Sequence, residues 1–383
     1  MQRLSSTPRP NSASALEENG VAGPFDETAH WHFSEAEIEH LYEVGREMYS
    51  MALVAAQHAA DSRLWPLFGL SPDAGRAILN SWNSRANEFD VITRLTVGWD
   101  GQSSPKLLGF QADSPAGLVE ASLGQWFWKE ALFPGSDQFN TLHEDISERL
   151  SGLYRAWLAR SRSPIRHSHT TYMPEDPVGR SQMNYLARLL GECGITNREI
   201  TLHDIGYDSA DGRFVDLAED EIKLLFKFHP WQDLITDPFG HNLLMSVEQE
   251  RVEVAEPAWK LLLSNRAILS VLWEQYPHHP LLTETHLTPE NFGWDQPAIA
   301  FPKFADGGLK PRHGHVQSKR FICDAPAPAA EEGEIFQAIT SLAGAQQGAS
   351  AVFDLWLVGD EPKGMGVREI REGGDVFVPH RFD

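Results

Sequence analysis

The residue types best suited to chemistry gather in one stretch, residues 91–120. Side chains alternate from residue 92 to residue 99, as they do in a strand with one buried face. Asp100-Gly101 follows, a dipeptide typical of hairpin turns, and residues 106–111 can return antiparallel to the first strand. The stretch then continues with apolar residues at helical spacing. We therefore expect a hairpin that leads into a helix.

One face of this hairpin is expected to be polar. Because side chains alternate with a period of two, Arg94 and Thr96 share a face of the first strand, and Gln111 and Asp113 share a face of the second. If those faces coincide, an arginine and an aspartate lie across a shallow polar groove. Such a groove suits a phosphate or a metal ion, and it equally suits an ordinary solvated sheet.

The same stretch carries a resemblance to a known family. The runs RLTVGWDGQSSPKLL, QADSPAGLVEA and QWFW are similar to the first signature block of the glutathionylspermidine synthase family, whose members are ATP-grasp carboxylate–amine ligases. Four further blocks follow in order, GSDQFN, EIKLLFKFHPWQDL, EPAWKLLLSNRAILSVLWEQYPHH and VFDLWLVGDEPKGMGVR. The resemblance implies an α+β chain, an ATP-grasp fold with a small pre-ATP-grasp βαβ layer and helical packing near the N-terminus.

This chain departs from the family where family members hold magnesium. The family has an aspartate on the first strand, and a glutamate and an asparagine on the return strand, as oxygen ligands for the ion. In this sequence the three positions are Thr96, Gly109 and Gln111, so both carboxylates are missing. The acidic side chains that remain close to the hairpin are Asp113 and Glu120, which we take as the candidate metal ligands. Glu120 falls on the expected helix and would have to point back.

The resemblance also assigns residues to the reaction itself. Arg94 and Arg368 correspond to arginines that stabilise the acyl phosphate and the tetrahedral transition state. Guanidinium groups suit that task because they bind oxyanions bidentately and stay charged. The alternative for each arginine is a structural ion pair.

The ATP-binding positions of the family are altered as well. Arg266 stands in place of a lysine that faces the nucleotide, and its planar guanidinium is a poor substitute in a tight phosphate pocket. Lys303 could replace the family's second lysine after a slip of one residue. Gly307 and Gly308 lie where the family has a phosphate-covering loop, although a surface turn explains the two glycines equally well. ATP and magnesium are thus the cofactors that the resemblance implies.

Domain boundaries follow from composition and from the same blocks. Residues 1–29 are rich in Ser, Pro, Ala and Asn, which predicts a disordered tail. The remaining residues, 30–383, form the family-like region, with the metal-site hairpin at 91–120, a pre-ATP-grasp-like part at 165–255 and an ATP-grasp-like part at 256–383. Ser34 and Glu37 predict a helix with a capping box, and residues 256–276 read as one amphipathic helix.

Composition narrows the classes of partner. The 383 residues include 32 Lys and Arg against 54 Asp and Glu, a formal charge of −22. This charge opposes binding to nucleic acid and to anionic membranes, and it favours cationic partners such as polyamines. Cys193 and Cys323 are too few for a disulfide framework, and no run approaches the roughly 18 apolar residues of a membrane span. The chain is therefore predicted to lie in the cytoplasm.

Paired histidines form a second kind of candidate site, at His30/His32, His167/His169 and His313/His315. On a strand, such a pair points two imidazoles to the same side and can begin a zinc or iron site. The sequence offers no third ligand at a definable spacing. An ordinary pair of histidines is the simpler interpretation of each.

Two functions remain open. An active family member would use ATP and magnesium to phosphorylate a peptide or amino-acid carboxylate, and an amine would then attack the acyl phosphate. The alternative is a degenerate member without catalysis, which binds a small molecule or a partner protein. Losing magnesium ligands removes the largest electrostatic contribution to such a reaction, so the residues favour the alternative while the fold favours the ligase class.

Overall fold

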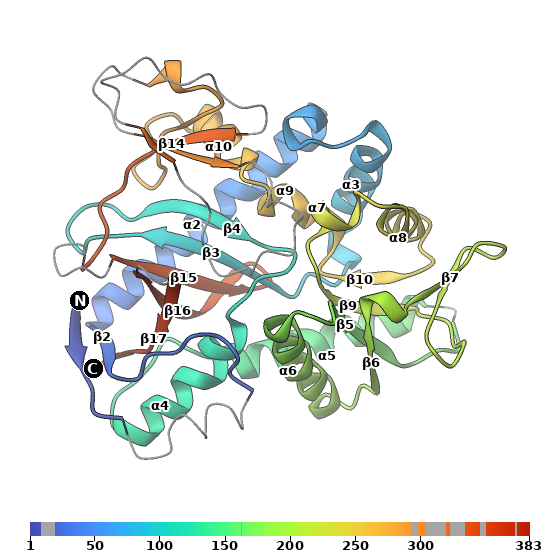
Figure 1. The fold of residues 1–383 in the computed structure, drawn as a ribbon, viewed down its shortest axis with the longest axis horizontal. Coiled ribbons are helices and arrows are strands. Elements are labelled where there is room, and N and C mark those ends of the chain that lie inside the picture. The colour runs from blue at the N-terminus through green and yellow to red at the C-terminus, as the bar shows by residue number, and fades with distance from the viewer. Residues whose placement is uncertain are drawn as a thin grey trace.

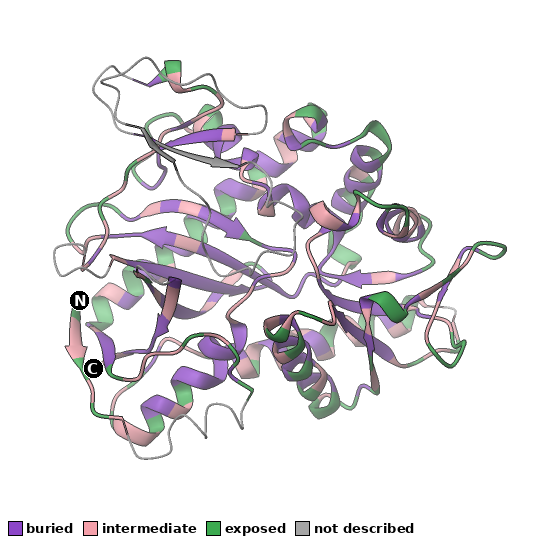
Figure 2. Cartoon of the chain, in the orientation of Figure 1, coloured by how far each residue is buried: buried purple, intermediate pink, exposed green. Residues whose placement is uncertain are grey.

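The computed structural model describes residues 1–8, 20–161, 163–292, 298–302, 319–321, 334–344, 350–371 and 374–383. They form three sheets of four or five strands and two smaller ones, with helices packed around them (Figure 1). Buried residues follow the strands and the inner faces of the helices, and exposed residues follow the outer faces (Figure 2). The expected α+β class is confirmed.

A five-stranded antiparallel sheet forms the centre of the molecule, in the order β17-β16-β15-β3-β4. Its middle strand, β15, includes the run VFDLWLV and is buried along nearly its whole length, as an apolar run with helices on its flank predicts. The strand bounds are Ile92–Gly98 for β3, Lys106–Gln111 for β4, Ser350–Val358 for β15, Glu361–Arg371 for β16 and Gly374–Val378 for β17.

The hairpin expected within residues 91–120 is present as β3 and β4. Arg94 pairs with Gln111 and Thr96 pairs with Gly109, so the two polar faces coincide, which the alternation had left open. Arg94 lies across from Gln111, and Asp113 bonds elsewhere, to Ser264 and Trp231. A π-helical turn at Glu120–Gly124 and helix α4, Gln125–Leu132, follow the hairpin. The hairpin therefore presents its polar residues on one side of the central sheet.

A four-stranded parallel sheet, in the order β10-β9-β5-β6, lies beside the central sheet. Helix α6 crosses over from β5 to β6 and packs on β5, β6 and β9, which is the expected βαβ unit. Helix α5 packs on α6 in turn (Figure 1). The bounds are Leu142–Arg160 for α5, Ser168–Tyr172 for β5, Pro177–Glu192 for α6, Asn197–Thr201 for β6, Leu224–Phe228 for β9 and Glu253–Ala255 for β10.

A buried cluster of charges joins the central sheet to the parallel sheet at the start of β3. The Lys260 ammonium is fully buried and lies 2.5 Å from Asp90 Oδ1 and 2.6 Å from Glu256 Oε2. It also donates a hydrogen bond to the carbonyl of Ile92 at 2.8 Å. Glu256 in turn accepts hydrogen bonds from the backbone N–H groups of Val91 and Ile92. These contacts hold the start of β3 against the segment that follows β10.

Helix α2, Glu35–Asp61, is the longest helix of the described chain and begins with the predicted capping box. The Ser34 side chain accepts from the Glu37 N–H, and the Glu37 side chain accepts from the Ser34 N–H. The other helices around the sheets are α3 at Pro72–Ser84, α7 at Trp231–Leu234, α8 at Pro238–Glu248, α9 at Leu261–Ser264 and α10 at Ala267–Gln275.

Replacing Ser34 with alanine is expected to lower the free energy of unfolding by about 1 kcal/mol, because it removes an N-cap acceptor. Denaturation in urea measures the change. Ser50→Ala is the matched control, since Ser50 is exposed within α2 and alanine favours a helix interior. An equal loss in the Ser50 variant would contradict a capping role.

The third large sheet stands apart from the other two, near α10 (Figure 1). Its strand order is β11-β14-β12-β13, and all the pairings are antiparallel. The bounds are Thr285–His286 for β11, Ala298–Pro302 for β12, Lys319–Phe321 for β13 and Glu334–Ala338 for β14. A short β7–β8 hairpin, Gly206–Asp208 and Arg213–Val215, projects from the opposite side of the molecule (Figure 1).

The start of the chain differs from the expected tail. Residues Gln2–Ser5 form β1, which pairs antiparallel with β2, Ala29–Phe33, and β2 pairs in parallel with β18, His380–Phe382. The composition of residues 1–29 gave no sign of this pairing, because the partner strands supply the apolar side chains and the hydrogen bonds. Residues 9–19 lie outside the described part of the chain.

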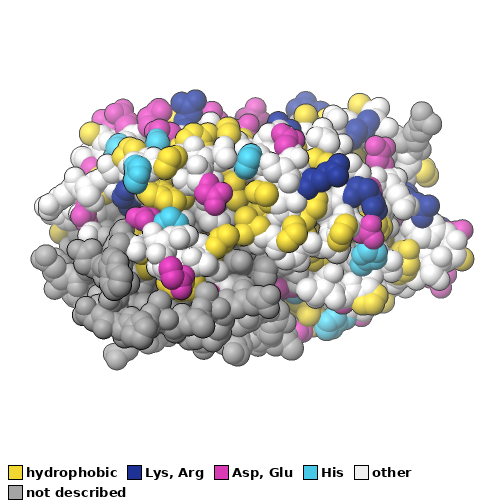
Figure 3. Space-filling model, turned by 90° about the horizontal axis from the view of Figure 1, so that it is seen from above, with side chains coloured by type: hydrophobic (Ala, Val, Ile, Leu, Met, Phe, Trp, Pro, Cys, Tyr) yellow, Lys and Arg dark blue, Asp and Glu magenta, His cyan; other side chains and the backbone are white. Residues whose placement is uncertain are grey.

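Acidic, basic and histidine side chains are interspersed on the molecular face seen in Figure 3. This mixture accords with a chain that carries both signs of charge in large number and an excess of acids. None of the helices in the described residues is long and apolar enough to cross a membrane.

Candidate anion-binding site on the central sheet

A cluster of charged side chains lies on one face of the central sheet. Thr96 on β3 lies directly opposite Asp354 on β15, and Arg94 lies opposite Trp356, so these side chains point to the same side. Arg368 on β16 reaches Asp354 from the other edge of β15. The strand register therefore brings together the two arginines that the sequence assigned to catalysis.

Asp354 is the centre of this cluster. Its Oδ1 accepts a hydrogen bond from Thr96 Oγ1 at 2.7 Å and another from Arg368 Nη2 at 3.0 Å. Its Oδ2 accepts from Arg368 Nε. The Nε atom of Arg94 lies 3.8 Å from Oδ1. Both carboxylate oxygens are thus occupied by donors from the protein.

The remaining contacts of the two arginines fix their orientation. Arg368 Nη1 donates to Asp375 Oδ2 at 2.6 Å, and Arg94 Nη1 donates to the carbonyl of Ala116 at 2.5 Å. The next residue, Gly117, has a φ of 94°, a left-handed conformation that suits glycine. It turns the loop directly after the Ala116 carbonyl that accepts from Arg94. Arg94 is almost fully buried, whereas Arg368 is half-buried and retains access to solvent.

The electrostatic effect of the cluster appears in the pKa values. Burial alone would raise the pKa of Asp354, but Arg368 and then Arg94 hold that pKa below its ordinary value of 3.8. Burial lowers the pKa of Arg94 to about 10, although Asp354 opposes this change. Burial and the nearby Arg368 also lower the pKa of Arg266 to about 10. All three guanidiniums are therefore charged at neutral pH.

Arg266 is the third arginine of this cluster. Its position depends on an interruption of the helix that was expected over residues 256–276. Helix α9 ends at Ser264, and Asn265 has an extended backbone with a ψ of 125° before α10 begins at Ala267. The guanidinium of Arg266 then lies over β4. A Cβ atom placed on Gly109 would lie 3.7 Å from Arg266 Nη1, which itself approaches the Leu108 carbonyl at 3.5 Å.

The donor set of this face does not fit a magnesium ion. Magnesium requires oxygen ligands in near-octahedral geometry, and carboxylates usually supply the charge. The three positions that carry ligands in the family hold a threonine, a glycine and a glutamine, and Asp354 is already bonded to Arg368 and Thr96. Three guanidiniums, those of Arg94, Arg266 and Arg368, suit an anion instead, a phosphate or a carboxylate.

The two candidate metal ligands have partners of other kinds. Asp113 Oδ1 accepts from Ser264 Oγ at 2.7 Å, and Oδ2 accepts from the N–H of Trp231 at 2.6 Å, at the start of α7. Glu120 Oε1 accepts from the N–H of Gly23 at 2.8 Å, and burial raises the pKa of Glu120. Neither residue joins a group of three metal-binding side chains within the described ranges. That they bind magnesium stays a prediction.

Three predicted ATP contacts cannot be placed. Lys303, Gly307 and Gly308 lie within residues 303–318, outside the described part of the chain. Their assignment to phosphate binding therefore stays a prediction as well.

Sequence reasoning missed Asp354 and Asp375, the two carboxylates of the cluster. Asp354 had a usable signal, because it is the single charged residue in the apolar run VFDLWLV, and a charge in such a run needs a partner. Asp375 had no such signal in the sequence, since its contact with Arg368 depends on how β17 pairs with β16.

Comparison with known proteins gives consistent matches over the whole chain. Residues 3–383 match the sequence model of a family described as glutathionylspermidine synthase preATP-grasp. A Haemophilus influenzae protein named "Putative acid–amine ligase" is 28% identical over 366 residues, which cover 92% of this chain and 89% of that protein. The bifunctional glutathionylspermidine synthetase/amidase of Escherichia coli is 25% identical over 294 residues, 71% of this chain and 46% of that enzyme.

A solved structure agrees at the level of the fold. A glutathione synthetase-like effector of Globodera pallida, in its apo form, superposes with a TM-score of 0.60 and covers 97% of this chain and 96% of that one. Sequence identity is 10%.

Proposed function

Because the chain belongs to the glutathionylspermidine synthase family of ATP-grasp ligases, we propose that it binds an anionic small molecule, a phosphate or a carboxylate, on the face that carries Arg94, Arg266 and Arg368. We propose further that magnesium-dependent ligation has been lost. The three arginines then supply the positive charge that holds the anion without a divalent cation.

One observation carries this proposal, the position of Arg266 beside Gly109. A glutamate at position 109 would begin 3.7 Å from the Arg266 guanidinium, so a carboxylate there would pair with the arginine. Glycine at position 109 supplies no carboxylate to this face, and Arg266 lies close enough to Arg368 for the two positive charges to act on each other. A half-buried cation in such a setting favours an incoming oxyanion, since hydrogen bonds to charged groups gain from partial burial.

A second candidate function is ligation with an altered metal site. Its support is that Arg94 and Arg368 share one face of the sheet and one partner, Asp354. The similarity to a relative named as an acid–amine ligase points in the same direction. On this hypothesis the chain would join a small-molecule carboxylate to an amine at the expense of ATP, with magnesium held by Asp113 and Glu120.

Calorimetric titration with ATP separates the two functions. We expect the affinity for ATP, and likewise the affinity for inorganic phosphate, to be the same in magnesium as in EDTA. We expect Arg266→Met to weaken the binding of each ligand about tenfold. Arg76→Met is the control, because Arg76 is an exposed arginine in surface ion pairs with Asp73 and Glu248. Its affinity should equal that of the wild type.

The opposite result would favour the ligase. If ATP binds at least tenfold more tightly with magnesium, and ADP forms in the presence of glutathione or glutamate together with a polyamine, the proposed loss of ligation is wrong. If Arg266→Met and Arg76→Met behave alike, the anion does not bind at the proposed face.

A further inference from the structure

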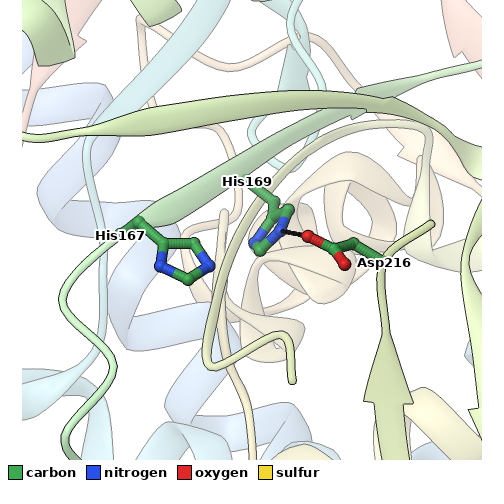
Figure 4. A group of neighbouring side chains, drawn as sticks. All are labelled: His167, His169 and Asp216. Carbon is green, nitrogen blue, oxygen red and sulfur yellow. Dashed lines mark hydrogen bonds and ion pairs between the residues drawn. The ribbon is translucent and has the colours of Figure 1, made fainter. Parts of the chain in front are cut away.

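A compact group of metal-binding side chains lies near the start of β5 in the parallel sheet. None of its residues belongs to the arginine face. His167 precedes β5, His169 lies within it, and Asp216 directly follows β8. Each residue offers one ligand atom, and these atoms all lie within 4.8 Å of one another. Figure 4 shows His169 between the other two side chains. The structure thus supplies the third ligand that the sequence could not identify for this histidine pair.

The two imidazoles have unused nitrogen atoms. His169 is fully buried, and its Nδ1 has no hydrogen-bond partner within the described chain. His167 Nε2 is also buried without a partner in that part of the chain. An unpaired buried polar atom is unfavourable, and a metal ion bound to His167 Nε2 would remove one of the two, while His169 would bind through Nε2, the nitrogen that lies 3.2 Å from Asp216 Oδ2.

Asp216 is held in a fixed orientation for a third ligand. Its Oδ1 accepts backbone hydrogen bonds from Ala218 at 2.9 Å and from Asp220 at 3.0 Å. Its Oδ2 lies 3.2 Å from His169 Nε2, close to the roughly 3.4 Å that separates two ligands of a tetrahedral zinc ion. Only His167 would have to move closer, and it lies in a loop.

One cation already competes for this carboxylate. Arg198 Nη1 lies 2.6 Å from Asp216 Oδ2 and 2.6 Å from Asp220 Oδ2. Arg198 sits on β6 opposite His169, and 41% of its side chain is exposed. It can therefore keep its contact with Asp220 if another cation takes the oxygen of Asp216.

We propose that His167, His169 and Asp216 form a binding site for a divalent transition-metal ion of the zinc type. Two imidazole nitrogens and one carboxylate oxygen suit Zn²⁺ or Co²⁺ and leave a coordination position for water, whereas Mg²⁺ prefers oxygen ligands alone. The ion would tie the end of β8 to the start of β5. In doing so it would fasten the projecting β7–β8 hairpin to the parallel sheet.

Metal titration of the untagged, chelator-treated full chain tests the site. We expect one Zn²⁺ per chain at this place, with Co²⁺ giving the visible absorption of a tetrahedral site and Mg²⁺ giving no binding. His167→Asn and Asp216→Asn should each weaken Zn²⁺ binding tenfold or more. Arg198→Met should strengthen it several-fold, because it removes the competing cation. Hydrogen exchange of residues 206–215 should slow when Zn²⁺ is added.

His32→Asn is the matched control. His32 is also part of a His-X-His pair and contacts a carboxylate, with its Nε2 3.2 Å from Asp383 Oδ2, but the residues around it form no group of three ligands in the described chain. Its Zn²⁺ affinity should equal that of the wild type. The proposal is wrong if neither the wild type nor Arg198→Met binds Zn²⁺, or if His167→Asn and Asp216→Asn bind it as the wild type does.

Discussion

Replacing Lys260 with methionine is expected to lower the free energy of unfolding by about 3–5 kcal/mol, the usual effect of breaking a buried ion pair on one side. The ammonium is 0% exposed and lies within 2.6 Å of a carboxylate oxygen on both Asp90 and Glu256. Methionine fills similar space without charge, so two buried carboxylates would face each other unneutralised. Denaturation in guanidinium chloride at neutral pH measures the loss.

A surface lysine provides the comparison for this variant. Lys223 pairs with Glu221 at 2.6 Å, and both side chains are 22% exposed. Lys223→Met should therefore cost less than about 1 kcal/mol. Lowering the pH should reduce the difference in the free energy of unfolding between the wild type and Lys260→Met, because protonation removes the carboxylate charges that Lys260 neutralises. Equal losses in the two variants would show that the buried cluster contributes no more than a surface pair.

The second large effect is expected from Asp354→Asn. This change removes the charge that compensates Arg94 and Arg368 while it keeps the shape of the side chain. We expect it to lower the free energy of unfolding by about 3 kcal/mol. Phosphate should restore part of the loss, because an anion that binds only the folded state stabilises it by mass action. The rise of the melting temperature with phosphate should be larger in the variant than in the wild type.

Acid titration gives an independent check on Asp354. The folded-state pKa lies below 3.8, so its contribution to stability is complete above the unfolded-state pKa of about 4 and disappears as the pH falls through the lower folded value. The stability curves of wild type and Asp354→Asn should therefore converge in acid. Asp208→Asn is the control, since Asp208 is a half-exposed partner of Arg213 away from the sheet cluster. A phosphate effect of the same size in that control would contradict specific anion binding at the sheet.

Much of the site's scaffold could be predicted because it depends on local patterns. Alternation and the Asp100-Gly101 turn predicted the hairpin and the side chains that share a face of each strand, whereas the register that places Arg94 beside Gln111 was left open. The capping box of α2 and the βαβ unit around α6 follow from similarly short stretches. The family resemblance gave Arg94 and Arg368 a common role, and the structure joins them through Asp354.

The contacts that could not be predicted depend on pairings between distant segments. Thr96 and Asp354 are 258 positions apart, and only the register of β3 against β15 brings them together. Asp216 meets the histidine pair across 47 positions of sequence, a contact that no local pattern encodes. The helix break at Asn265 was also missed, since residues 256–276 keep an apolar helical period through it.

The close approach of Arg266 to Gly109 also constrains how this sequence can change. With 3.7 Å between a Cβ at position 109 and the guanidinium, a side chain longer than alanine at 109 must displace the arginine or bond to it. The two positions are therefore coupled, and a change at one alters the surroundings of the other. We expect the effects of changes at 109 and at 266 on the free energy of unfolding to be non-additive, which a double-mutant cycle measures.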